Sequence, residues 1–176
     1  MWEYFDFQTE GDLLLTLRIS HSFSSSVFFK ISKIKNDYYV YWRKGLNRRD
    51  LFTLIWTEQI RVPELKKYSM EKAVHHPIIE TQLLQMSPIT KLRLNAHQVQ
   101  AIDLLLKNGL DENVAFSEGL DGHDYYLEIM KPKHIKRHCW CVLPKEWEQF
   151  GTVIEFLVDD IANLEKGLYG VKGYTE

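Results

Sequence analysis

The stretch that decides the fold is residues 13–20, which read LLLTLRIS. Alternate positions of this run are apolar: Leu13, Leu15, Leu17 and Ile19. The positions between them, from residue 16 onward, are polar: Thr16, Arg18 and Ser20. Successive side chains of a strand point to opposite sides, so this period of two separates an apolar face from a polar face. The run therefore predicts a half-buried β-strand.

The segments that follow repeat the pattern. Residues 27–32 alternate in the same way, and a third run at 38–42 comes after a turn-like Lys-Asn-Asp sequence, so an antiparallel meander is predicted. Residues 51–62 are apolar and rich in β-branched and aromatic side chains, which favours a further strand. We expect that strand to end at Pro63, because proline cannot donate to a strand ladder.

The sequence signals for secondary structure are weakest in residues 63–92. Three prolines, Pro63, Pro77 and Pro88, are spaced around one possible short helix at residues 78–86. We expect an irregular connection here. A connection of this length inside a compact domain often has a function of its own.

Two amphipathic helices are expected in the second half of the chain. The first follows Asn95, with Gln98 in capping-box position, and ends before Gly109. The second is expected to begin at Pro144, a favourable first helical residue. Its apolar stripe has the strongest helical spacing in the sequence: Trp147, Phe150, Ile154, Leu157, Ile161, Leu164 and Leu168. Glycines end this helix and leave 172–176 as a loose tail.

Between the two helices the sequence predicts more strands. Residues 114–116 and 125–129 are expected to pair around an Asp-Gly turn at 121–122, and residues 135–143 form another strand. Strands, a helix, strands and a helix in 176 residues predict an α+β fold. We expect one domain over residues 1–176, in which an antiparallel sheet packs against two principal helices.

Composition limits the possible partners. The chain is 45% hydrophobic and 13% aromatic, which is typical of a folded protein, and its net charge of −2 provides no overall basic field for nucleic acid or anionic membrane. The N-terminus is acidic where a signal peptide is basic, and no apolar run reaches the length of a membrane span. With only Cys139 and Cys141 present, we expect a reducing, cytoplasmic location and no membrane partner.

One segment contains residue types that bind zinc: His134, His138, Cys139 and Cys141. On a strand, the two histidines point to one side and the two cysteines to the other, so they do not readily share an ion. The other close pair of histidines lies in segment 63–92. Core cysteines and surface histidines are the favoured alternative, and we expect no metal site and no cofactor.

The sequence shows no catalytic motif. Ser24 to Ser26 lie in a predicted turn that lacks the Gly-x-Ser-x-Gly elbow, and the neighbours His123 and Asp124 point to opposite faces of a strand. No glycine-rich phosphate loop is present. A metal-free nuclease that uses histidines and a lysine of residues 134–138 is a distant alternative. We therefore expect a protein that is not an enzyme.

Two charged surfaces are predicted. Residues 33–49 contain lysines and arginines interleaved with aromatic side chains: Tyr38, Tyr39, Tyr41 and Trp42. This composition is typical of RNA or single-strand binding, but a buried tyrosine face beside an edge-protecting lysine row is the favoured alternative. On the final helix, Glu148, Glu155 and Asp159 lie off the apolar stripe. Such a face is usually only solvated, and the alternative that we carry forward is that it binds a basic partner, such as a nuclease.

The last third of the chain resembles a known class of proteins. Residues 119–129 read GLDGHDYYLEI, a tryptophan-bearing strand follows at Trp140, and residues 144–147 (PKEW) open the amphipathic C-terminal helix. This order is similar to that of small bacterial immunity proteins, which neutralise polymorphic or contact-dependent growth-inhibition toxins. The resemblance implies a non-enzymatic cytosolic protein that binds a cognate toxin domain. The alternative function is binding of RNA or single-stranded nucleic acid by residues 33–49.

Overall fold

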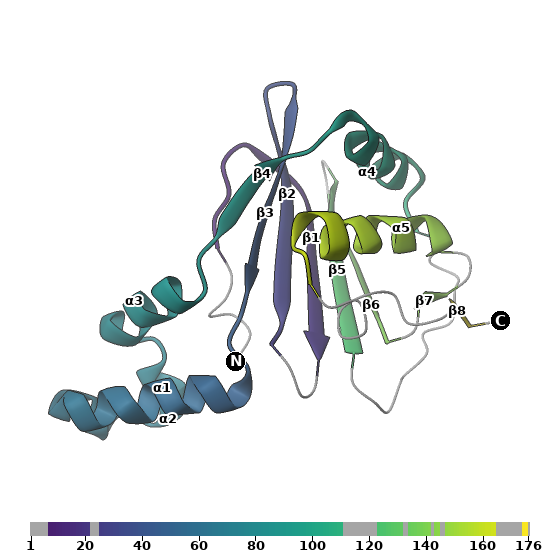
Figure 1. Cartoon of the computed structure of the whole chain (residues 1–176). Coiled ribbons are helices and arrows are strands. Elements are labelled where there is room, and N and C mark those ends of the chain that lie inside the picture. The colour runs from purple at the N-terminus through teal and green to yellow at the C-terminus, as the bar shows by residue number, and fades with distance from the viewer. Residues whose placement is uncertain are drawn as a thin grey trace.

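The centre of the molecule is an antiparallel sheet with the strand order β4-β3-β2-β1-β5-β6 (Figure 1). The computed structural model describes residues 7–21, 25–110, 123–131, 134–141, 143–144, 147–164 and 174–175. The strands are β1 (Asp12–His21), β2 (Val27–Ile34), β3 (Asp37–Lys44), β4 (Thr90–Arg93), β5 (His123–Lys131) and β6 (His134–Trp140). All neighbouring strands of this sheet run antiparallel. The predicted α+β class and the N-terminal meander are confirmed.

The quoted alternation of β1 sets the two faces of the sheet. Leu17 lies opposite Phe29 of β2 and Leu127 of β5, and all three side chains are fully buried. These apolar faces pack beneath α4 (Ala96–Asn108) and α5 (Glu148–Phe156), which is continued by a π-helical turn at Leu157–Ile161. Figure 1 shows α5 crossing in front of the sheet, with α4 above it. We call this layer the main core.

The start of α4 matches its sequence signature. The side chain of Asn95 accepts a hydrogen bond from the Gln98 amide at 3.0 Å, and the Gln98 side chain accepts one from the Asn95 amide at 3.0 Å. Two N–H groups that have no partner within the helix are thereby satisfied. The helix ends at Gly109, whose φ of 71° is easily reached only by glycine.

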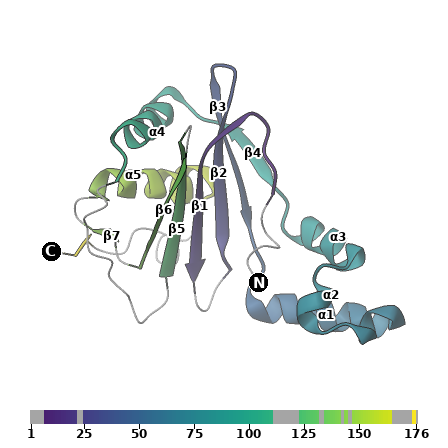
Figure 2. The ribbon, with the colours of Figure 1, turned by 180° about the vertical axis from the view of Figure 1, so that it is seen from behind.

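The second face of the sheet carries helices, of which the sequence predicted only the short one at residues 78–86. Residues 51–62 are not a strand, because they belong to α1 (Arg48–Arg61). Residues 63–92 are not an irregular connection, since they form short elements: η2 (Pro63–Lys67), α2 (Met70–Ala73), α3 (Pro77–Met86) and β4. These helices bury a second apolar cluster against Phe28 and Tyr41, which we call the helical cluster. Figure 2 shows α1, α2 and α3 grouped on the β3 and β4 side of the sheet.

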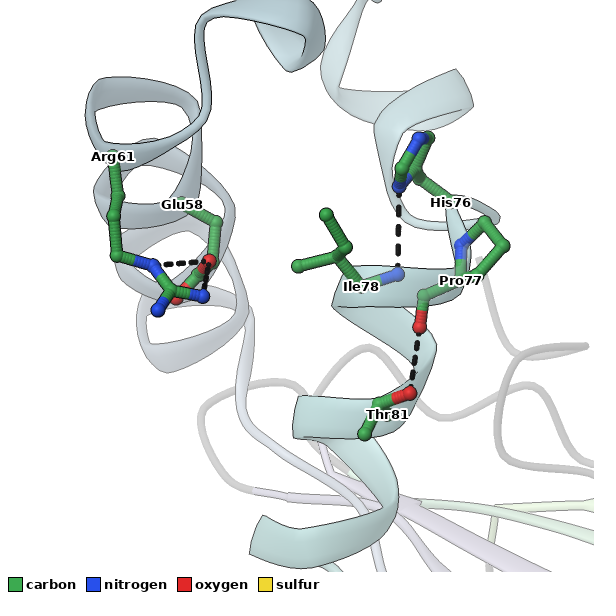
Figure 3. A network of polar contacts seen from close by, with 6 residues as sticks. All are labelled: Glu58, Arg61, His76, Pro77, Ile78 and Thr81. Carbon is green, nitrogen blue, oxygen red and sulfur yellow. Dashed lines mark hydrogen bonds and ion pairs between the residues drawn. The ribbon is translucent and has the colours of Figure 1, made fainter.

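Local capping explains these helices. The Asn47 side chain accepts the Asp50 amide at 2.8 Å and starts α1. Near its end, the Arg61 guanidinium binds the Glu58 carboxylate at 2.7 Å. Figure 3 shows this pair and the start of α3, where His76 Nδ1 accepts the Ile78 amide and the Thr81 hydroxyl donates to the Pro77 carbonyl at 2.8 Å.

The C-terminal region differs from its prediction at both ends. Pro144 does not open a helix, because it lies in β7 (Leu143–Pro144), which pairs in parallel with β8 (Tyr174–Thr175). The described part of the expected loose tail is therefore a strand. The last helix starts at Glu148, and its helical path is complete before Asn163, whose φ is 46°. Strand β5 contains the predicted run 125–129, whereas residues 114–116 and the Asp-Gly turn lie outside the described residues.

Candidate functional site

The second face of the sheet is covered only in part. The helical cluster packs on the β2 and β3 side, and Figure 2 looks onto β1, β5 and β6 with no described helix in front of them. A concave pocket with a volume of about 620 Å³ opens on this uncovered part. That volume lies within the range of small-ligand sites. All of the lining residues belong to β1, β2, β5 and β6, and we call this concavity the sheet pocket.

Three cations line the sheet pocket. The Arg18 guanidinium lies over the ring of Tyr126, with its carbon 3.9 Å from the ring centroid. Lys30 is only 8% exposed, and its ammonium donates to the carbonyl of Phe7 at 2.6 Å. At the rim, Arg137 Nε donates to Glu128 Oε1 at 2.8 Å. These contacts hold each positive charge in a defined position.

The Tyr126 phenol and the Cys139 thiol also line the pocket. Burial is the largest cause that raises the pKa of the Tyr126 phenol, and it is also the largest cause that raises the pKa of the Cys139 thiol. The lining therefore includes three cations and one carboxylate, Glu128. Its apolar lining is contributed by Leu13, Phe28 and Met130.

The structure separates the candidate zinc ligands. His138 lies opposite Leu127 on the main-core side, and its ring meets Trp147 edge-on with centroids 5.4 Å apart. Cys139 lines the sheet pocket on the other side. Both side chains are half-buried, so neither a core cysteine nor a surface histidine is found at these two positions. The predicted split is confirmed for His138 and Cys139. Within the described residues, no group of three metal-binding side chains converges.

The basic and aromatic residues of β3 do not form one exposed surface. Tyr41 is 5% exposed and Arg43 is 2% exposed, and the Arg43 guanidinium donates to the Ser87 hydroxyl at 3.2 Å. Burial lowers the pKa of Arg43. Tyr39 packs against the helical cluster, whereas Trp42 packs against the main core on the opposite side. The stacking surface that nucleic-acid binding requires is not formed by these residues.

The predicted acidic face is present on the outer side of α5. Glu148 and Glu155 are exposed, while Asp159, in the π-helical turn, is half-buried. Behind them Phe150 and Ile154 are fully buried in the main core, so the helix is held firmly on the sheet. Two of the three predicted partner-binding residues therefore lie on one accessible surface.

A further surface was missed because its residues were assigned to a strand. Trp56 and Ile60 of α1 are 64% and 63% exposed, with half-buried Phe52 one turn before Trp56. Large exposed hydrophobic side chains of the described chain concentrate in this part, between residues 48 and 93: Trp56, Ile60, Leu84, Met86, Ile89 and Leu92. We call Phe52, Trp56 and Ile60 the outer stripe of α1.

No described helix has the length and apolar character required to span a membrane. Comparison with known proteins identifies no relative, since no protein-family model, no curated protein and no solved structure matches this chain. A functional proposal must therefore be built on the surfaces described above.

Proposed function

We propose that this chain is an immunity protein that binds a cognate antibacterial toxin domain in the cytoplasm and neutralises it without catalysis. The observation that carries the proposal is the outer stripe of α1. Tryptophan and isoleucine side chains that are more than half exposed lose solvent contact favourably when a partner covers them. The resemblance of the C-terminal third to immunity proteins suggests the class of partner.

The outer stripe has the features of an interface anchor. Its members are spaced four residues apart, so they lie along one side of α1, as the anchors of a helix that docks into a groove do. Leu51 and Ile55 on the inner side are buried, which fixes the orientation of the helix. Tryptophan and arginine are the residue types most enriched among interface hot spots, and the exposed Arg48 lies over the Phe52 ring at 5.2 Å.

The acidic face of α5 offers a second contact surface for the same function. Carboxylates at Glu148 and Glu155 complement a basic toxin, such as a nuclease whose own surface binds phosphate. Complementary charge mainly accelerates encounter, whereas buried aromatic anchors slow dissociation. The two surfaces therefore predict different kinetic effects.

The test starts from the reading frame next to this gene, which the proposal expects to encode a toxin domain. Co-expression of the two proteins should restore growth, and the purified pair should form a stable complex. The double variant Trp56→Ala/Ile60→Ala should weaken the complex by roughly 100-fold, mainly through faster dissociation. Leu104→Ala on α4 is the matched control, because Leu104 is an exposed hydrophobic residue at 44% outside the stripe.

The charge-reversal variant Glu148→Lys/Glu155→Lys measures the acidic face. It should slow association by about tenfold at low salt and have little effect at high salt. Failure of the wild-type protein to protect cells or to bind the adjacent toxin would refute the proposed function. Protection that survives the double stripe variant unchanged would refute the role of α1.

A further inference from the structure

We propose that the sheet pocket is a binding site for a carboxylate carried on an apolar body. This inference concerns a different surface from the outer stripe and does not depend on the identity of the toxin. The pocket combines Arg18, Lys30 and Arg137 with apolar walls in a concavity of about 620 Å³. Cations in a partly dehydrated concavity attract an anion more strongly than cations on open surface do.

The charge balance of the pocket selects an anionic ligand. Tyr126 and Cys139 stay protonated near pH 7, because the ordinary pKa of each lies above 7 and burial raises it further. Glu128 is the single carboxylate among the described lining residues, and it is already bound by Arg137. An entering carboxylate therefore meets a net positive surface, whose charge it reduces.

The shape of the site favours a carboxylate over a phosphate. Phosphate sites commonly use helix N-termini or glycine-rich loops that present free backbone N–H groups. The lining here belongs to four strands of the sheet, whose backbone groups are largely committed to strand pairing. Recognition is left to side chains, and the planar guanidinium fork of arginine matches a planar carboxylate.

The apolar part of the ligand is predicted from the apolar side chains of the lining. Leu13, Phe28 and Met130 line the pocket together with the cations. Such a surface fits an aliphatic or aromatic body, and methionine adapts to bodies of different shape. The same chemistry is offered by a free carboxylic acid and by the C-terminal carboxylate of a peptide that ends in an apolar residue.

The Arg137–Glu128 pair at the rim makes the proposal sharply testable. A ligand carboxylate competes with Glu128 for the Arg137 guanidinium. Removing the Arg137 charge should therefore weaken binding, while removing the Glu128 charge should strengthen it. An almost identical pair lies at the far edge of the sheet, between Arg93 of β4 and Asp37 of β3. The side chains of the rim pair are 71% and 38% exposed, and those of the far pair are 66% and 39% exposed.

The first experiment titrates the full chain with octanoate by isothermal calorimetry at neutral pH. Saturable binding is expected, with Arg137→Gln weakening it by about tenfold and Glu128→Gln strengthening it by about threefold. Arg93→Gln and Asp37→Asn are the matched controls and should leave the affinity unchanged. A tighter Glu128→Gln variant is a result that a purely structural role of the pair would not produce.

A second titration distinguishes the two sources of the carboxylate. It compares octanoate with an acetylated tripeptide ending in leucine and with the amide of that peptide. Tighter binding of the acid peptide than of octanoate assigns the site to a chain terminus, and the reverse assigns it to a free acid. Absence of saturable binding by both acids would overturn the proposal, as would equal binding of the acid and amide peptides or equal effects of Arg137→Gln and Arg93→Gln.

Discussion

The two faces of the same sheet bury two different kinds of core. The main core lies under α4 and α5, and its strand residues come from the strict alternation of β1, β2 and β5. The helical cluster is smaller and is assembled from α1 and three shorter helices around Leu51, Leu65 and Ile79. Exposed hydrophobic side chains are concentrated on the second of these regions. The comparison suggests that one face provides stability and the other face provides contact surface.

The main core should show the largest effect of a single truncation. Phe150 of α5 is fully buried between the helix and the sheet. Phe150→Ala removes its ring and leaves a cavity, so we expect the free energy of unfolding to fall by about 4 kcal/mol. Urea denaturation followed by tryptophan fluorescence measures the change. A loss below about 1.5 kcal/mol would show that this layer is not the principal source of stability.

The helical cluster provides the next test. Leu65 of η2 is fully buried there, and Leu65→Ala should lower the free energy of unfolding by about 3 kcal/mol. The cluster is built from short elements, so we expect the loss to be local. Hydrogen exchange should accelerate in residues 48–86 while the amides of β1, β2 and β5 remain protected.

The result of this exchange experiment decides whether the main core and the helical cluster unfold independently. If Leu65→Ala accelerates exchange in the main core and the helical cluster equally, the molecule unfolds as one cooperative unit. The contrast between a stabilising face and a contact face would then be wrong. Ile102→Ala in α4 is the matched variant, because Ile102 is fully buried in the main core. It should accelerate exchange throughout the sheet.

The same contrast explains what the sequence could predict. Each main-core strand carries its own period-two signal, and α4 carries a capping box at Asn95, so these elements were recognisable locally. Helix α1 was not, because Leu51 and Ile55 face inward while Phe52, Trp56 and Ile60 face outward. Apolar residues on two sides of a helix remove its amphipathic period, and the segment then resembles a buried strand.

The sheet pocket and the burial of Arg43 could not be predicted from local sequence patterns, for a different reason. Arg18 and Tyr126 are far apart in the sequence and meet because β1 pairs with β5. Strand order across a sheet has no local signature. Arg43 was assigned to an exposed basic stretch, yet the chain after α3 brings Ser87 to its guanidinium. Such long-range contacts depend on the arrangement of elements, which composition and periodicity do not define.

The smallest expected effect tests the link between the sheet and α4. The Tyr38 hydroxyl donates to the Asp103 carboxylate at 2.6 Å, which joins β3 to the helix. Tyr38→Phe should lower the free energy of unfolding by about 1 kcal/mol near pH 8, because Asp103 is exposed and water replaces part of the bond. Chemical denaturation of both proteins measures this difference.

The contribution of Tyr38 should also depend on pH. The hydrogen bond to Asp103, then burial, raises the pKa of Tyr38 from 10.0 to about 12. Because the pKa of the Tyr38 phenol is raised in the folded state, this group contributes its full stabilisation below pH 10. The contribution is lost as the pH rises toward 12. The difference between wild type and Tyr38→Phe should therefore shrink over that interval. In an Asp103→Asn background the change with pH should be smaller, and a difference that stays constant from pH 8 to pH 12 would contradict the assigned role of the Tyr38–Asp103 bond.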